Sequence, residues 1–480
     1  MYPKMIPSPK NYEISEEICL VNASIFTEEK AFLPGCDLFS GMYQTLYGVS
    51  LLREPGGIML IRDSSLAPGS YVLDAGDTIR AFASDTEGIY YALSSLLQLT
   101  TYDNCHIEIS RLHIEDSPDK DYRSLMIDLA REWHPFPKLL KFVDLCFFFK
   151  IKYLHLHFMD GLRYTLPSRV FPRLSSENEH YTFEQIAQLN AYAKERGIVL
   201  VPEYECPGHS MHVVQTYPDV FADHAGGKPL GNLYREDGKL IAYRNIMCPS
   251  SPASIQGNQA LLKEIADLFP DSPYIHIGGD EADIQQWKEC DDCSLYMRQN
   301  GIEDVYELYS KFVGRIASYV LSLGRTPIVW EGFPQKGHDH IPKETIVVAW
   351  ESYYHMVYDL LDEGFRVINA SWSPLYIVPS FTNRWDSFDI LQWNVYRWQH
   401  WWPKSEAYLN PITVPETDRV LGAILCSWEQ TFEQEINAVM ENIAAVSERT
   451  WNVRRMVSDE TYNEIFQSQR KTLARLIQDR

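Results

Sequence analysis

Eight compact apolar runs, separated by segments with helical spacing, constrain the fold of this chain more than any other feature of its sequence. The runs lie at 122–128, 151–157, 198–203, 273–279, 326–331, 345–350, 366–371 and 420–428. Strands that are buried on both faces give continuous apolar runs, and parallel neighbours need long crossovers, which helices usually supply. Eight such strands are the number that closes a barrel. The sequence therefore predicts an α/β fold with a (β/α)8 TIM barrel.

Amphipathic segments fill most of the spaces between these runs. One of them is opened by a capping box of Thr182 and Gln185 and is closed by Gly197. The predicted helices are 137–149, 182–196, 254–268, 302–322 and 353–364, with two more at 432–448 and 458–478 outside the barrel. Long loops at 203–250 and 371–415 interrupt this alternation of apolar runs and helical segments. Long loops in compact domains are usually functional.

A smaller module precedes the barrel. Short strand-like runs and one helical stretch, 86–101, occupy residues 12–118, and the polar segment 115–122 follows them. We therefore expect three parts: a small α+β domain at 1–118, the barrel at 119–431, and C-terminal helices at 432–480 packed on the barrel.

The composition is that of a globular protein with a strongly acidic surface. Of 480 residues, 45% are hydrophobic and 22% are charged, and 65 acidic side chains against 43 Lys and Arg give a net charge of −22. Such a surface repels nucleic acid and anionic membranes and suits a neutral or cationic small ligand. We expect no nucleic-acid or membrane partner, and the sequence leaves the oligomeric state open.

Location and redox state are indicated by the first residues and by the cysteines. The stretch MYPKMIPSPKNYEI has prolines and a charge where a secretory signal needs a continuous apolar segment. Nine scattered cysteines do not describe a disulfide framework. Cys290 and Cys293 form a lone C-x-x-C without a second pair, a weak indication of zinc or redox use. We expect a cytoplasmic protein with no metal and no cofactor.

Chemistry in such a barrel belongs at the carboxyl ends of the strands. Polar and aromatic side chains at those positions are Asp128, Arg131, His155, His157, Asp160, Glu203, His209, Asp280, Glu281, Trp330, Trp350, Trp372, Tyr376 and Trp428. A strand-end histidine is often structural, and we favour that interpretation for His155 and His157. A lone strand-end tryptophan usually belongs to the core, but several together suit a sugar ring, which has apolar faces and a polar rim.

The adjacent carboxylates Asp280 and Glu281 follow two glycines in YIHIGGDEAD. Two carboxylates that share one centre commonly cleave glycosidic bonds, but chain neighbours cannot flank a sugar from opposite faces. A structural ion-pair site is the simpler alternative for this pair.

From about residue 80 to 430 the chain resembles glycoside hydrolase family 20, the β-N-acetylhexosaminidases. The segments that carry the resemblance are YRSLMIDLAR, YLHLHFMD, VPEYECPGH, HIGGDEAD, VWEG, VAW and GAILCSWEQ. The resemblance implies a reaction without a protein nucleophile, in which the 2-acetamido oxygen of the substrate attacks the anomeric carbon. Glu281 would be the general acid and base, and Asp280 would orient the acetamido group and stabilise an oxazolinium-like intermediate.

The resemblance also implies a set of substrate-binding residues. Arg123 would hold the 3- and 4-hydroxyls, Asp160 would lie near the same rim, and His209 would lie near the acetamido group and the acid. Tyr376 would donate to the acetamido oxygen. The walls of the acetamido pocket and the platform under the ring would be Trp330, Trp350 and Trp428.

Two positions depart from the family pattern. Val378 stands where the family usually has Asp, and Gln430 stands where it commonly has Glu. Both lost acids normally touch the 4- and 6-hydroxyls. An amide donates and accepts, so Gln430 as a binding residue predicts relaxed or GalNAc-leaning selectivity. The alternative is that Asp160 or Glu429 restores the lost contact.

Two other classes of function remain open at this point. A metal-dependent amidohydrolase would use His155, His157 and Asp280, but it needs further strand-end histidines, for which only His209 and His276 are candidates. A carbohydrate-binding protein without catalysis is the second alternative, and turnover of a chromogenic N-acetylhexosaminide would exclude it. The sequence does not set the preference for GlcNAc or GalNAc, the leaving group or the glycan length.

Overall fold

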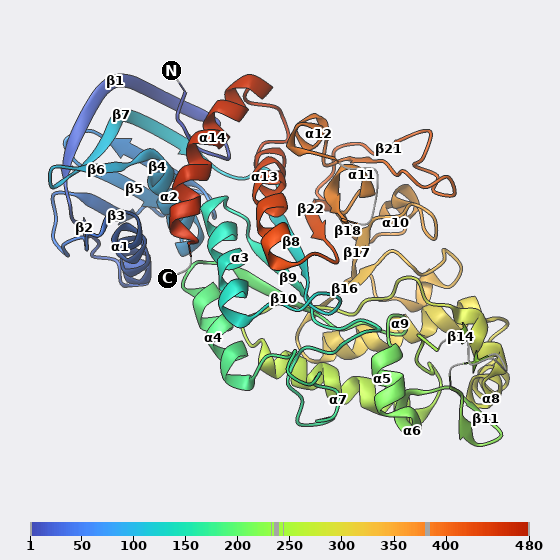
Figure 1. The fold of residues 1–480 in the computed structure, drawn as a ribbon. Coiled ribbons are helices and arrows are strands. Elements are labelled where there is room, and N and C mark those ends of the chain that lie inside the picture. Colours follow the sequence, from blue (N-terminus) through green and yellow to red (C-terminus); the bar gives the residue numbers. More distant parts are fainter. Residues whose placement is uncertain (1, 232, 235–239, 243, 380–384, 479–480) are drawn as a thin grey trace.

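The computed structural model describes residues 2–231, 233–234, 240–242, 244–379 and 385–478. Among them, eight parallel strands close into a barrel with helices around it (Figure 1). The strands are β8 (Tyr122–Asp128), β9 (Tyr153–His157), β10 (Val199–Glu203), β15 (Tyr274–His276), β16 (Thr326–Trp330), β17 (Ile346–Ala349), β18 (Arg366–Asn369) and β22 (Val420–Ser427). Pairing of β18 with β22 closes the ring, and the short β19 (Tyr376–Ile377) pairs with the end of β22. The predicted TIM barrel is confirmed.

Helices on the outside of the barrel cover the apolar strands. They are α3 (Phe136–Phe148), α4 (Phe183–Lys194), α7 (Pro252–Leu268), α9 (Val305–Ser322), α10 (Val357–Asp362) and α13 (Phe432–Trp451). The capping box of α4 is present, with Thr182 and Gln185 each bonded to the other's backbone N–H. The helix predicted at 302–322 begins only at Val305, because Asp304 caps it through the N–H groups of Tyr306 and Glu307.

The loops at the carboxyl ends of the strands hold the remaining short elements. After β10 these are α5 (Met211–Thr216), α6 (Pro218–Phe221) and the small pairs β11 (His224–Ala225) with β12 (Lys228–Pro229) and β13 (Leu233–Tyr234) with β14 (Leu240–Ala242). After β15 come η2 (Ile284–Glu289) and α8 (Asp291–Asn300), and η3 (His338–His340) follows β16. After β18 come α11 (Trp372–Leu375), α12 (Ser387–Gln392), β20 (Arg397–Trp398) and β21 (Ile412–Thr413).

The small domain is a mixed sheet with two helices. Its strands are β1 (Asn11–Asn22), β2 (Ile25–Phe26), β3 (Ile58–Arg62), β4 (Tyr71–Ala75), β5 (Ile79–Ala83), β6 (Thr101–Asp103) and β7 (His106–Asp116), in the order β1-β7-β4-β5-β3-β2 with β6 on β7. The helices are α1 (Leu33–Tyr47), preceded by η1 (Lys30–Phe32), and α2 (Thr86–Leu99). The α2 helix packs on β4 and β5 and also reaches α3, so it joins the sheet to the barrel.

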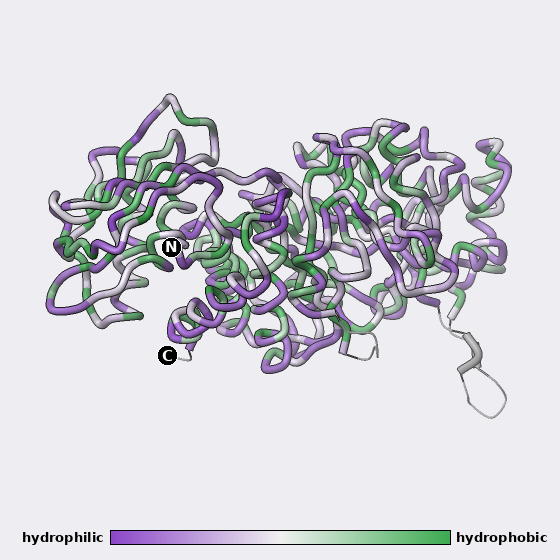
Figure 2. The backbone as a smooth tube through the Cα atoms, turned by 90° about the horizontal axis from the view of Figure 1, so that it is seen from above, coloured by the Kyte–Doolittle hydropathy of each residue, from purple (hydrophilic) through white to green (hydrophobic). Residues whose placement is uncertain are grey.

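The last two helices pack on different partners. The α13 helix lies on β22 and β8 of the barrel, whereas α14 (Asp459–Leu476) contacts α1 of the small domain as well as α3. Figure 1 shows α14 across the junction, and Figure 2 shows the small domain beside the barrel from a second direction. Gln469 on α14 donates to the carbonyl of Gln98 at 3.0 Å. The second C-terminal helix therefore secures the two parts of the molecule to each other.

No helix among the described residues is long and apolar enough to cross a membrane.

Candidate active site

A cavity of about 250 Å³ lies at the carboxyl ends of the barrel strands. We call it the aromatic cavity; its lining residues are Arg131, Asp280, Glu281, Trp330, Trp350, Trp372, Tyr376, Val378, Trp428 and Glu429. Five of these ten side chains are aromatic and three are carboxylates, so the cavity combines apolar walls with a charged rim. Of the residues predicted for the site, Asp280, Glu281, Trp330, Trp350, Tyr376 and Trp428 line it.

A glycine turn after β15 places the two carboxylates. Gly278 and Gly279 have φ angles of 67° and 98°, a region that residues with a Cβ rarely adopt. A Cβ on Gly278 would also lie 1.8 Å from Glu205 Oε2. The hydroxyl of Tyr309 donates to the carbonyl of Gly279 and fixes the turn. Asp280 and Glu281 therefore leave the strand end at a defined angle into the cavity.

His209 lies between the carboxylate pair and Asp160. Its Nε2 is 3.4 Å from Glu281 Oε2 and 3.7 Å from Asp280 Oδ2, and its Nδ1 is 3.3 Å from Asp160 Oδ2. Burial lowers the pKa of His209, but the carboxylates around it, Asp280 foremost, outweigh burial and raise this pKa well above its usual value. His209 is thus a buried imidazolium that organises three carboxylates.

The two carboxylates differ in their electrostatic surroundings. Burial raises the pKa of Asp280 to about 6, with His209 opposing the rise and Glu281 adding to it. The hydrogen bond from His209 lowers the pKa of Glu281. Asp280 Oδ1 is buried and accepts no hydrogen bond from any described residue. Asp280 therefore offers a free acceptor inside the cavity, and a buried acceptor of this kind gains most from a ligand N–H.

Glu203 organises the layer beneath the cavity. Its carboxylate accepts from His155 at 2.9 Å, from His157 at 2.6 Å and from Trp330 Nε1 at 2.5 Å, and it lies 3.0 Å from His276 Nδ1. Burial raises the pKa of Glu203, but these histidines hold it well below its usual value. His155 and His157 are therefore structural: they hold Glu203, which in turn fixes the Trp330 ring.

Aromatic rings form the walls of the cavity. Trp372 stacks on Tyr376 with centroids 4.3 Å apart and a 17° interplanar angle, and Trp350 lies 6.1 Å from Tyr376. Trp330 and Trp428 lie 6.1 Å apart with a 45° tilt. The Trp350 indole donates to the carbonyl of Glu331 at 2.8 Å, which fixes its orientation. These rings surround a space suited to one small ring with apolar faces.

Arg123 does not lie at the site, contrary to the expectation. It is the second residue of β8, at the amino end of the barrel, and is fully buried. Its guanidinium donates to the carbonyls of Lys150, Lys120 and Asp121 and to the Tyr91 hydroxyl. A residue at the start of a parallel strand cannot reach the end where chemistry occurs.

Arg131 is the arginine of the cavity. Its guanidinium is 2.7 Å from Asp160 Oδ2, 3.6 Å from Asp128 Oδ2 and 4.8 Å from the centroid of the Trp428 ring. Sequence reasoning named Arg131 at a strand end but did not assign it to substrate. The rule that the carboxyl end carries the chemistry would have selected Arg131 over Arg123, because Arg131 follows the last residue of β8 by three positions.

Three other expected binding residues do not line the aromatic cavity: His209, whose contacts are given above, Asp160 and Gln430. Asp160 is buried, and its carboxylate bonds Arg131, His157 and His209, so it positions these side chains instead of facing a ligand. Gln430 is also buried: its amide donates to Ser427 Oγ at 2.8 Å, and its side chain lines a neighbouring cavity with Gln434.

Glu429 takes the place expected for Gln430. Its side chain lines the cavity, with its carboxylate 4.0 Å from Arg131, and its backbone N–H donates to Asp128 at 3.3 Å. Its φ of 55° turns the chain so that Glu429 faces the aromatic cavity and Gln430 faces the neighbouring cavity. The family pattern puts an acid two residues after Trp428. In this chain the positive φ of Glu429 brings the acid that follows Trp428 directly to the cavity.

Trp372, another residue at a strand end, forms part of the cavity wall by stacking on Tyr376.

Three of the eight described non-glycine residues with positive φ lie around the cavity. His209, Glu281 and Glu429 have φ angles of 46°, 44° and 55° although none is glycine. Each such residue costs on the order of 1–3 kcal/mol, and residues of this kind cluster at functional sites. Glu281 and Glu429 belong to the charged rim of the cavity, and His209 belongs to the ion-pair network that supports it.

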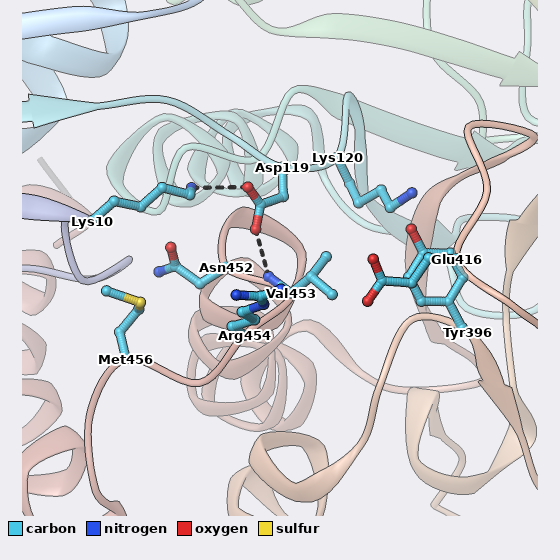
Figure 3. Close-up of a pocket in the computed structure, with 9 residues that line it drawn as sticks. All are labelled: Lys10, Asp119, Lys120, Tyr396, Glu416, Asn452, Val453, Arg454 and Met456. Atoms are coloured by element: carbon cyan, nitrogen blue, oxygen red, sulfur yellow. Dashed lines mark hydrogen bonds and ion pairs between the residues drawn. The ribbon is translucent and has the colours of Figure 1, made fainter.

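A second cavity, of about 450 Å³, lies near the amino end of β8 (Figure 3). Several of its polar groups are already paired: Lys10 lies 3.4 Å from Asp119, which accepts from the Val453 N–H at 2.8 Å, and Lys120 donates to the Val420 carbonyl at 2.8 Å. The amino face of such a barrel usually serves stability. The aromatic cavity is therefore the candidate active site.

Comparison with protein families places the chain in a known class. The model for "Glycosyl hydrolase family 20, catalytic domain" matches residues 121–454, which include the whole barrel and α13. The chain belongs to glycosyl hydrolase family 20.

Individual relatives agree with this assignment. A beta-hexosaminidase of Vibrio furnissii is 28% identical over 334 residues, 65% of this chain and 53% of that protein. A beta-hexosaminidase of Akkermansia muciniphila is 32% identical over 280 residues, 55% of each. The chain thus spans little more than half the length of these two relatives.

A solved structure has the same fold. The β-N-acetylhexosaminidase of Bacteroides fragilis superposes with a TM-score of 0.80 at 23% identity, covering 97% of this chain and 95% of that one. The shared architecture includes the small domain as well as the barrel.

Proposed function

We propose that this chain is an exo-acting β-N-acetylhexosaminidase that removes terminal, non-reducing β-linked GlcNAc or GalNAc with retention of configuration. The observation that carries the proposal is that the adjacent Asp280 and Glu281 both line one small aromatic cavity, where Asp280 Oδ1 is a buried free acceptor. A cavity of about 250 Å³ suits one terminal sugar and not an extended chain.

In the first step the acetamido oxygen attacks the anomeric carbon while the bond to the leaving oxygen breaks. Glu281 gives its proton to that oxygen, and the sugar becomes an oxazolinium ion. Asp280 accepts a hydrogen bond from the acetamido N–H and balances the growing positive charge. In the second step Glu281 takes a proton from water, the water oxygen bonds the anomeric carbon, and the ring of the oxazolinium opens.

Tyr376 and the tryptophans hold the acetamido group for this attack. Burial raises the pKa of Tyr376 well above its usual value, so its hydroxyl stays protonated and can donate to the acetamido oxygen. The walls formed by Trp350, Trp372 and Trp428 restrict the group to the attacking orientation, and such restriction accounts for much of the advantage of an intramolecular nucleophile.

Arg131 and Glu429 are the groups we assign to the hydroxyl rim. Together they offer a cationic donor and an anionic acceptor 4.0 Å apart at the cavity wall. We therefore assign selectivity at the 4-hydroxyl to Glu429 and not to Gln430. Of the two departures from the family pattern, only Val378 lines the cavity, so any relaxed selectivity between GlcNAc and GalNAc depends on Val378.

The test is hydrolysis of nitrophenyl β-GlcNAc and β-GalNAc, with the anomer of the first product identified by proton NMR. We expect turnover of at least one substrate and initial release of the β-anomer. Release of the α-anomer would contradict the proposed mechanism, and binding without turnover would favour the carbohydrate-binding alternative. The amidohydrolase alternative is less favoured, because His155, His157 and His276 all pair with Glu203 beneath the cavity.

A further inference from the structure

Three cysteines and an aspartate meet in a buried cluster outside the aromatic cavity. We call Asp223, Cys248, Cys290 and Cys293 the cysteine cluster; one ligand atom from each lies within 4.8 Å of every other, and all four residues are buried. Cys248 Sγ is 3.7 Å from Cys290 Sγ and 3.8 Å from Cys293 Sγ, so the sulfurs are close but not bonded. Sequence analysis singled out the C-x-x-C pair, and the fold supplies the other two members.

The spacing of the sulfurs fits a tetrahedral metal. Zinc–sulfur bonds of about 2.3 Å at tetrahedral angles put two sulfurs about 3.8 Å apart. A disulfide would instead need about 2.05 Å. Backbone N–H groups face the sulfurs as well: Ser251 donates to Cys248 Sγ at 3.4 Å, and the N–H groups of Cys293 and His224 are directed at Cys290. Such donors stabilise thiolates more than neutral thiols.

Asp223 gives an independent indication of a cation. Its side chain is fully buried, yet neither carboxylate oxygen accepts a hydrogen bond from a nitrogen or oxygen donor among the described residues. A buried carboxylate without such partners is costly unless a cation binds it. The nearest charged group is Arg244, with Nη1 3.9 Å from Asp223 Oδ2.

We propose that the cysteine cluster is a structural zinc site with three thiolate ligands and one oxygen of Asp223. Three thiolates and a carboxylate carry four negative charges against two on zinc, and Arg244 offsets part of the excess. A set of four protein ligands leaves no position for substrate, which is typical of structural zinc and not of catalytic zinc.

The ligands join two segments that flank the active site. Asp223 and Cys248 come from the long loop after β10, whereas Cys290 ends η2 and Cys293 lies in α8, after β15. Cys290 follows Glu281 by nine positions. The Trp287 indole donates to the Met247 carbonyl at 3.0 Å across the same junction. Zinc would therefore hold the segment that carries the catalytic pair against the loop that carries His209.

Metal analysis of the purified full chain tests this proposal. We expect about one zinc per chain after growth with zinc, and tetrahedral thiolate spectra when cobalt replaces it. Cys293→Ser and Asp223→Asn should lower bound zinc, the former by more than about tenfold, since even outer partners of a ligand change metal affinity 10–100-fold. Cys146→Ser, a buried thiol on α3, is the matched control and should keep the metal.

The wild-type measurement stands even if a cluster variant fails to fold. Wild-type chain that takes up no zinc during growth or on reconstitution would overturn the proposal, as would equal zinc loss in the Cys146→Ser control. Removing the metal should lower the melting temperature and restoring it should raise it again. An unchanged melting temperature after complete removal would show that bound zinc is not structural. None of these readouts depends on the proposed glycosidase activity.

Discussion

The chemistry of single residues separates the roles of Asp280 and Glu281. Glu281→Gln removes the proton donor, so we expect kcat/KM for natural glycans to fall by roughly 10²–10⁴. Nitrophenyl substrates, whose leaving groups need less protonation, should lose much less. Rate measurements on both substrate types give the comparison, and equal losses would count against Glu281 as the acid.

The pH profile follows from the proton that the two carboxylates share. The active form carries one proton, on Glu281, while Asp280 is ionised. Burial raises the pKa of Asp280 to about 6 and the hydrogen bond from His209 lowers that of Glu281, so the active form is the minor one of the two singly protonated forms. The pair loses its proton as the pH rises through about 6, so kcat/KM for natural glycans should decline above that pH. Glu281→Gln assayed with a nitrophenyl substrate should lack this decline. A decline of the same size in the variant would assign it to another group.

Two arginines, eight residues apart, test the correction made by the structure. Arg131→Gln should lower kcat/KM, because Arg131 lies at the cavity rim, and it should destabilise less than Arg123→Gln, because His157 and His209 still pair with Asp160. Arg123→Gln should lower the free energy of unfolding by about 2–3 kcal/mol, because it leaves buried carbonyls without a charged donor. Chemical denaturation and kinetics on both variants separate the effects. The reverse result would restore Arg123 to the active site.

Glu429 and Gln430 form a second matched pair. Glu429→Gln removes a charge from the rim and should lower kcat/KM by at least about tenfold, the equivalent of 1.4 kcal/mol. It should also change the ratio of GlcNAc to GalNAc rates. Gln430→Glu should leave that ratio unchanged, since Gln430 bonds Ser427 away from the cavity. A ratio that responds to Gln430 alone would refute this assignment of the rim.

At the scale of the element, the turn after β15 carries the most constraint. Gly278→Ala places a Cβ against Glu205, whereas Gly301→Ala has nearly the same φ, 64°, and open space around it. Gly301→Ala should cost only backbone strain, about 1 kcal/mol. Gly278→Ala should cost more and reduce activity sharply by moving Asp280. Thermal unfolding and kinetics of the two variants provide the measurement, and equal behaviour would mean that the turn adapts.

The strands and helices were predictable where one physical pattern dominates. Apolar runs marked all eight barrel strands, because burial on both faces favours apolar residues along most of each strand. The small domain was harder: β1 carries exposed polar residues at half of its twelve positions and has a continuous apolar run only at 18–21, and α1 contains two glycines, Gly35 and Gly41. The pattern of apolar and polar residues does not predict the backbone angles of single residues, and the positive φ of Glu429 is an example.

At the scale of the whole molecule, the fold decides which motif residues meet. The carboxylate pair, His209 and all five cavity aromatics could be selected from strand-end positions, because parallel strands deliver their carboxyl ends to one face. The cysteine cluster could not, since Asp223 and Cys248 lie on a long loop whose path no periodicity describes. Nor did the sequence indicate that α14 would join the small domain to α3.

The central claim is that the acetamido group of the substrate is the nucleophile and that Asp280 supports it. A thiazoline mimic of the oxazolinium intermediate tests this directly by calorimetric titration against the wild type and Asp280→Asn. The account predicts wild-type binding on the order of a hundredfold or more tighter than that of the N-acetyl sugar product, as for a transition-state analogue. It predicts much weaker binding to the variant. Equal affinity of the two proteins for the thiazoline would contradict substrate-assisted catalysis at this site.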